Sequence, residues 1–192
     1  MPFIHLRTHT EFSVVDGTLR IDDLVAAAKD DRQPALAITD LSNLFGAVKF
    51  YSAARKKGVQ PIIGADVSLE ADEPQRPASR LLLLIQNSQG YLHLSELLGD
   101  AWTAPGQRTH ATVSWANLQA KSAGLIALSG AEMGVIGQAL TQGDLARAQA
   151  LAQRLGGIFE GRFYIELQRS GHGTNETYIR AAVPLASRLG LP

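Results

Sequence analysis

The sequence lacks cysteine and has no excess of either charge. Its 192 residues include 18 Lys or Arg and 18 Asp or Glu, which gives a formal net charge of zero. The absence of cysteine excludes disulfides and thiolate metal sites and fits a reducing cytosol. The charge balance gives no sign of a basic groove for nucleic acid or of a surface that selects an acidic partner.

The sequence also lacks a signal peptide and an apolar run of membrane length. The run LLLLI at 81–85 is far too short to cross a bilayer. Hydrophobic residues make up 45% of the chain, which is enough for one domain with a true core. We therefore expect a soluble cytoplasmic chain without a membrane partner, forming a single domain over residues 1–192.

Short apolar runs alternate with longer amphipathic segments along the chain. The short runs predict strands, and the apolar spacing of the long ones predicts helices. The strands are expected at 3–6, 35–39, 60–71, 80–86, 124–130 and 162–168. The helices are expected at 21–31, 46–58, 90–102, 114–120, 133–143, 144–156 and 175–190, with loops at 70–79 and 103–112. Gly58 should end the second helix, and Pro184 should bend the last one.

This alternation of buried strands and helices predicts parallel pairing with right-handed crossovers. Six strand candidates, each followed by a helix or loop, favour a barrel over an open sheet. The sequence reaches its last residue just after a helix, where a further strand should begin. We therefore expect an α/β barrel that is incomplete at its C-terminal side.

Several polar residues follow the predicted strands, where an α/β barrel carries its working side chains. Carboxylates and a histidine on one rim suit Mg²⁺ or Mn²⁺, or zinc with more imidazoles. A permanent cation, Arg7, stands two residues before His9, where a second imidazole would complete an H-x-H pair. The positions after successive strands are Arg7, His9, Asp16, Asp40, Leu41, Asp66 and Ala131.

The same residues also have structural explanations, which the residues taken alone favour. A lone histidine such as His9 after a strand is more often hydrogen-bonded than metal-bound. Asp40, just before Ser42 and Asn43, is suited to cap the following helix. The dipeptide Asp16-Gly17 is typical of a turn.

Five motifs together carry a family resemblance: HLRTHTEFSVVDG, PALAITDLSNLFGAVKFY, PIIGADV, LIALSGAEMG and FYIELQRSG. In this order and at this spacing, the sequence resembles the N-terminal polymerase-and-histidinol-phosphatase (PHP) domain of bacterial replicative DNA polymerase III alpha subunits, of the proteobacterial type. The resemblance runs from residue 3 to the end. It implies a distorted (β/α)7 barrel whose last strand, with the family's last Asp/His motif, would lie beyond Pro192.

Active members of this family bind about three metal ions and cleave phosphoester bonds, with the ions activating water. The resemblance implies that most of the metal ligands are lost here, although His9 and Asp16 match the pattern. Arg7, Leu41 and Arg80 replace histidines, Ala131 replaces a cysteine, and Asp66 replaces a glutamate. Ser170 stands where a histidine is often found, and His172, two residues on, is a candidate for a displaced substitute. We therefore expect neither catalysis nor a cofactor in this chain.

Arginine has no lone pair and stays protonated, so it neutralises acids where metal ions once did. We infer that Arg7 and Arg80 pair with Asp16, Asp40 or Asp66. Such a pocket, lined by Arg7, His9 and Arg80, would favour an anion such as phosphate. The residual candidates for metal binding are His9, Asp16, Asp40 and Asp66.

The resemblance implies that the parent protein is a DNA-directed DNA polymerase that uses Mg²⁺ and contacts DNA through other domains. For this chain it implies a structural role against the rest of the alpha subunit and a docking surface for the proofreading epsilon subunit. Trp102 and Trp115 are either exposed docking residues or core. The competing hypotheses are a residual metal-dependent phosphoesterase or 3′–5′ exonuclease and a freestanding phosphate-binding domain.

Overall fold

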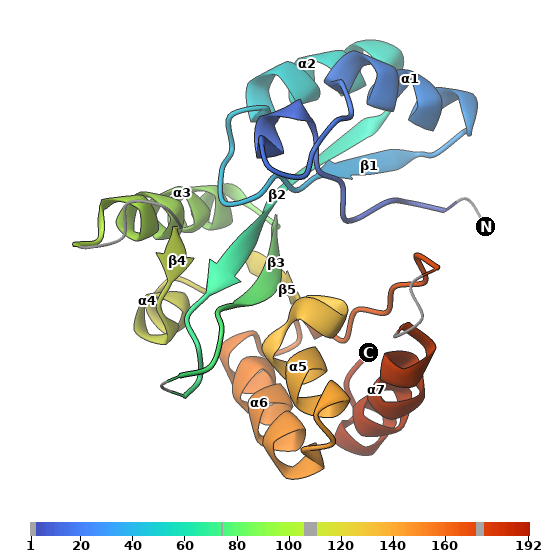
Figure 1. Cartoon of the computed structure of the whole chain (residues 1–192). Coiled ribbons are helices and arrows are strands. Elements are labelled where there is room, and N and C mark those ends of the chain that lie inside the picture. Colours follow the sequence, from blue (N-terminus) through green and yellow to red (C-terminus); the bar gives the residue numbers. More distant parts are fainter. Residues whose placement is uncertain (1–2, 74, 106–110, 172–174) are drawn as a thin grey trace. The chain divides into compact units, whose positions relative to one another are not determined.

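The computed structural model describes residues 3–73, 75–105, 111–171 and 175–192, which form a mixed α/β fold (Figure 1). The strands are β1 (Ala35–Ile38), β2 (Gln60–Leu69), β3 (Ser79–Ile85), β4 (Thr112–Val113), β5 (Leu125–Leu128) and β6 (Phe163–Tyr164). The α-helices are α1 (Ile21–Asp30), α2 (Ala47–Lys57), α3 (Ser88–Thr103), α4 (Trp115–Ala120), α5 (Val135–Thr141), α6 (Leu145–Ile158) and α7 (Asn175–Leu189). Two short 3-10 helices are η1 (Glu11–Ser13) and η2 (Ala131–Met133).

The strands form one sheet in the order β1-β2-β3-β5-β6, with β4 paired to β2. Pairing is parallel for β1 with β2, β2 with β4 and β5 with β6, as the alternation of strands and helices predicts. No pairing among the described residues joins β1 to β6, so closure into a barrel is not shown and the incomplete barrel stays an expectation. The chain divides into two compact units, unit 1 (1–67 and 82–85) and unit 2 (68–81 and 86–192).

Unit 1 has its own core between two helices and the start of the sheet. Apolar residues at helical spacing on α1 and α2 meet the side chains of β1, and both helices lie on one face of this strand (Figure 1). Gly58 ends α2 in a left-handed conformation, as predicted. The buried core residues are Ile21, Val25, Ala28, Leu36, Ile38, Phe50, Ala54 and Val59.

Unit 2 packs its helices around a second set of buried residues. In this unit α5 lies against both α6 and α7, and α3 lies against β4 and β5. The predicted loop at 103–112 ends in a two-residue strand, β4, that sequence reasoning missed. The helix α7 continues through Pro184, and the bend predicted there stays a prediction.

The predicted strand at 3–6 is wrong, although the segment runs beside β1. The amide of Ala37 in β1 donates to the His5 carbonyl, and the amide of Thr39, directly after β1, donates to the Thr8 carbonyl. The two donors are thus two residues apart, whereas the two acceptors are three residues apart. The N-terminal segment thus has one extra residue, and a regular ladder cannot form. This irregularity falls on the stretch that contains Arg7.

None of the described helices combines the length and the apolar character that crossing a bilayer requires.

A buried ion pair in unit 2 joins the loop after β2 to α6. The Nε and Nη2 atoms of Arg147 donate to the two carboxylate oxygens of Asp72, each at 2.7 Å. Both side chains are less than a tenth exposed, at 8% and 9%. The hydrogen bond from Arg147 lowers the pKa of Asp72, and burial opposes this shift.

We predict that Arg147→Met lowers the free energy of unfolding by about 3 kcal/mol, because it leaves the Asp72 carboxylate buried without its partner. The matched control is Arg76→Met, which removes the exposed pair with Glu73 and should change stability by less than about 1 kcal/mol. Urea denaturation followed by circular dichroism measures both. Equal losses in the two variants would contradict the prediction.

Candidate functional site

Unit 1 brings Arg7 onto the carboxylate of Asp66. Asp66 lies within β2 and its side chain is 2% exposed, while Arg7 lies on the extended segment beside β1. The Nη1 atom of Arg7 donates to Oδ2 of Asp66. The expected pairing of Arg7 with a carboxylate of this rim is therefore present, and Asp66 is its partner.

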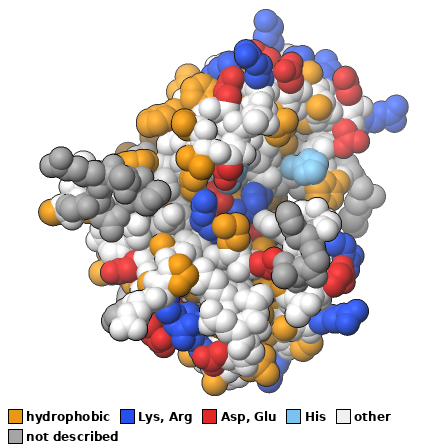
Figure 2. Space-filling model, viewed as in Figure 1, with side chains coloured by type: hydrophobic (Ala, Val, Ile, Leu, Met, Phe, Trp, Pro, Cys, Tyr) orange, Lys and Arg blue, Asp and Glu red, His pale blue; other side chains and the backbone are white. Residues whose placement is uncertain are grey.

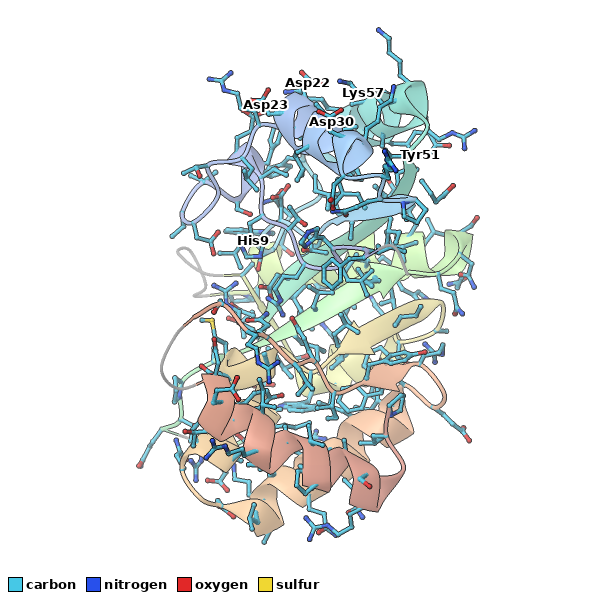
Figure 3. All side chains as sticks on the ribbon, turned by 90° about the vertical axis from the view of Figure 1, so that its right-hand side faces the viewer. His9, Asp22, Asp23, Asp30, Tyr51 and Lys57 are labelled. Atoms are coloured by element: carbon cyan, nitrogen blue, oxygen red, sulfur yellow. The ribbon has the colours of Figure 1, made fainter. Side chains whose placement is uncertain are left out.

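His9 lies between two carboxylates on the same rim (Figure 3). Its Nε2 atom is 3.2 Å from Oδ2 of Asp66, and its Nδ1 atom is 3.0 Å from Oδ1 of Asp16. Burial lowers the pKa of His9, but the hydrogen bonds and negative charges of Asp66 and Asp16 outweigh it, so the pKa is raised above 6.5. The protonated imidazolium is thus the favoured form of this residue at mildly acid pH.

Asp40 has a different role from its neighbours. It is 1% exposed and accepts three hydrogen bonds: from the Thr10 amide at 2.6 Å, the Thr10 hydroxyl at 2.8 Å and the Ser13 hydroxyl at 2.9 Å. Both of its oxygens therefore hold the segment around η1. Sequence reasoning missed Thr10 and Ser13, because they lie 30 and 27 residues before Asp40 in the chain and only the fold brings them together.

Leu41 connects these residues through its backbone. Its amide donates to the Ser13 hydroxyl at 3.0 Å, and the residue forms an isolated parallel bridge with Asp66. The leucine side chain has no donor or acceptor atom. This position therefore contributes to the packing of the rim and offers nothing to a ligand.

Arg80 and Ala131, the two remaining predicted positions, belong to unit 2. A Cβ atom added to Gly130 would lie 2.3 Å from the Arg80 carbonyl oxygen, so the turn before η2 passes directly over the β3 backbone. Gly130 has a φ of +80°, which favours glycine. Ala131 follows it and is buried, with no side-chain atom that binds metal. The pairing of Arg80 with a carboxylate stays a prediction.

Unit 2 holds a hydrogen-bond network that the sequence did not indicate. Asn175 is buried, receives hydrogen bonds from the amide and hydroxyl of Ser170, and donates to Glu132 at 2.9 Å. The Tyr178 hydroxyl donates to the Glu166 carbonyl at 2.8 Å, and burial raises its pKa to about 12. These bonds fix the loop after β6. The candidate His172 lies outside the described residues.

The two tryptophans have different environments. Trp115 is buried and donates from Nε1 to the Glu70 carbonyl. The guanidinium carbon of Arg154 lies 3.9 Å from the centroid of its ring. Trp115 is therefore core. Trp102 is 47% exposed at the end of α3, so it alone of the two remains a candidate for docking.

Within the part of the chain that the structure describes, no group of three or more His, Asp or Glu side chains is arranged to hold a metal ion. The three acidic candidates already have protein partners: Asp66 faces Arg7 and His9, Asp16 faces His9, and Asp40 accepts from the η1 segment. The arrangement places a guanidinium and an imidazole against the buried Asp66, and the same imidazole against the exposed Asp16.

Comparison with known protein families identifies the family to which this chain belongs. The PHP domain matches residues 5–170, which is most of the chain. The chain belongs to the PHP domain family. All the rim positions described above fall inside the matched region.

The similar proteins are DNA polymerase III alpha subunits. The chain is 45% identical to that of Pseudomonas aeruginosa, 43% to that of Neisseria meningitidis serogroup A and 37% to that of Escherichia coli K12, in each case over 99% of its length. It spans only 16%, 17% and 16% of these relatives. The chain therefore corresponds to one part of much longer proteins.

One solved structure supports the fold over nearly the whole chain. A proposed metal-dependent phosphoesterase from Bifidobacterium adolescentis has a TM-score of 0.54, with 98% of this chain and 83% of that chain covered. The sequence identity is 14%, so the likeness concerns the fold alone.

We predict that Arg7→Met lowers the free energy of unfolding by about 3 kcal/mol, because the buried Asp66 charge loses its principal partner. In a double-mutant cycle, combining Arg7→Met with Asp66→Asn should cost less than the sum of the single changes, since the second change removes the uncompensated charge. Arg20→Met, at an exposed arginine, is the control and should stay within about 0.5 kcal/mol. Additive losses in the cycle would show that the pair does not couple.

The raised pKa of His9 predicts a pH dependence of stability. Because the folded state holds the proton more tightly, the stabilisation by His9 is complete below pH 6.5 and is lost as the pH rises through the folded-state pKa. The stability difference between the wild type and His9→Asn should therefore shrink from about pH 6 to about pH 8. Urea unfolding across this range measures it, with His5→Asn as the control at an exposed histidine. A difference that stays constant or grows with pH would contradict the assignment.

Proposed function

We propose that this chain is the N-terminal PHP domain of a replicative DNA polymerase III alpha subunit, with a degenerate metal site. In this proposal the domain is structural and is a docking platform for the proofreading epsilon subunit. DNA-directed DNA synthesis, its Mg²⁺ ions and the contacts with DNA belong to other parts of the parent subunit. The identity of 37–45% to alpha subunits over 99% of this chain supports the assignment.

The main support for a degenerate metal site is the hydrogen bond that the Arg7 guanidinium donates to the Asp66 carboxylate. A metal ion at this carboxylate would lie against a permanent positive charge, which repels it. Leu41 and Ala131 offer no ligand atom, and both Asp40 oxygens are engaged by the η1 segment. The residues present therefore do not fit the metal cluster of active family members.

The expectation of an anion site receives less support from the geometry. The positive charges of Arg7 and His9 both face Asp66, and His9 also faces Asp16. The carboxylates of Asp66 and Asp16 thus balance the side chains of Arg7 and His9. An anion such as phosphate would have to displace these carboxylates, so we place anion binding below the structural role.

The alternative is a residual metal-dependent phosphoesterase or 3′–5′ exonuclease. The fold shared with the Bifidobacterium adolescentis protein and the proximity of His9, Asp16 and Asp66 favour it. This alternative requires Arg7 to leave Asp66, because the ion pair and a metal ion compete for the same oxygen.

The test uses the full-length subunit that carries this sequence. We predict that immobilised subunit retains purified epsilon subunit, that it binds fewer than two Mn²⁺ or Zn²⁺ ions per chain at the PHP domain, and that it does not degrade 3′-labelled single-stranded DNA. Epsilon binding is measured by gel electrophoresis of the protein retained on the immobilised subunit, and metal content by elemental analysis of the free subunit after dialysis.

Controls separate the two functions. If nuclease activity appears and belongs to this site, His9→Asn should abolish it. The control Asp23→Asn changes an exposed carboxylate on α1 and should leave the activity unchanged. Two or more bound ions with activity of this kind would replace the structural proposal by the enzymatic one. Failure to retain epsilon would remove the docking role.

A further inference from the structure

Four apolar side chains on unit 1 are more exposed than any other large hydrophobic side chain in the described residues. Val15 is 84% exposed, Val14 82%, Val48 80% and Phe45 74%. We call these four residues the rim patch. Single exposed apolar residues are ordinary, but a group that a fold holds out to solvent marks a contact surface.

The two segments that carry the rim patch are joined to each other. Asn43 donates from Nδ2 to the Phe12 carbonyl at 2.9 Å and accepts from the Phe45 amide at 3.0 Å. Lys49 forms an ion pair with Glu11 at 2.9 Å. The segment that follows η1 and the start of α2 therefore form one surface, and Figure 2 shows hydrophobic side chains gathered at the upper left, over this region.

The backbone turns the two valines outward. The Ser13 hydroxyl is held by Asp40, and the next residue, Val14, has a φ of +61°. This conformation is unfavourable for a β-branched residue, whose Cβ crowds the backbone. The Val15 amide donates back to the Ser13 carbonyl at 2.6 Å, which closes the turn. The strained backbone at Val14, which follows the buried hydrogen bond between Ser13 and Asp40, thus keeps Val14 and Val15 exposed.

The charges beside the rim patch are already paired within unit 1. Glu11 is paired with Lys49, and Asp16 with His9. The patch therefore offers no net charge to an acidic or basic partner. The buried centre of a protein contact is depleted in charged residues and enriched in apolar and aromatic ones, which is the composition of this patch.

We propose that the rim patch is the contact surface for the remaining polypeptide of the same subunit, which covers it with uncharged apolar side chains. This inference rests on the proposed function. The alpha subunits that match 99% of this chain are about six times longer, since the chain spans 16% of them. The covering chain is therefore available in cis and at a permanently high effective concentration.

The experiment places the photo-crosslinking amino acid p-benzoylphenylalanine at position 45 of the full-length subunit. The matched control carries it at position 57, because Lys57 is also exposed but lies at the opposite end of α2 (Figure 3). After irradiation without epsilon, mass spectrometry should show intramolecular cross-links from position 45 to peptides beyond residue 192, at several times the yield found from position 57.

Three results would overturn the proposal. The first is cross-linking to a second copy of the subunit, and the second is cross-linking to epsilon that occurs only when epsilon is added. The third is a cross-linking yield from position 45 that does not exceed the yield from position 57. A second variant at position 48 guards against a local effect of the substitution and should give the same peptides. Retention of epsilon by the same preparation is scored separately, so failure of the docking role and failure of the rim contact are distinguishable.

Discussion

The ion pair between Arg7 and Asp66 is the interaction on which the chemistry of the rim depends. Asp66 is almost completely buried within β2, where an isolated carboxylate would be very unfavourable. The guanidinium supplies the positive charge, and His9 adds a second contact to the same oxygen. A fixed protein cation thus satisfies an acid that would otherwise need a metal ion or a proton.

The rim therefore separates two uses of acidic residues. Asp66 and Asp16 face cationic side chains, whereas Asp40 accepts only amide and hydroxyl hydrogen bonds. The first group sets the electrostatic balance of the surface, and the second sets the path of the chain around η1. The exposed valines follow directly from that path, since the Ser13 hydroxyl that Asp40 holds immediately precedes them.

The sequence was sufficient to predict the parts of the fold that depend on regular periodicity. Apolar spacing gave α1 and α2 nearly to their ends, and Gly58 gave the end of α2. The prediction of a strand at 3–6 was wrong because one extra residue in this segment prevents a regular hydrogen-bond ladder with β1. A hydrophobic pattern gives no sign of such an extra residue. At the site, the charge of Arg7 indicated its pairing with a carboxylate. The hydrogen bonds on Asp40, in contrast, come from Thr10 and Ser13, which only the fold brings close to it.

The three hydrogen bonds on Asp40 limit how this rim could be redesigned. A cation that bound Asp40 would compete for its oxygens with the amide of Thr10 and two hydroxyls, which hold the turn that follows. Metal coordination and loop order therefore compete at this residue. An engineer who wished to rebuild a hydrolytic centre on this scaffold would have to begin at positions 7 and 41, and leave position 40 untouched as part of the frame.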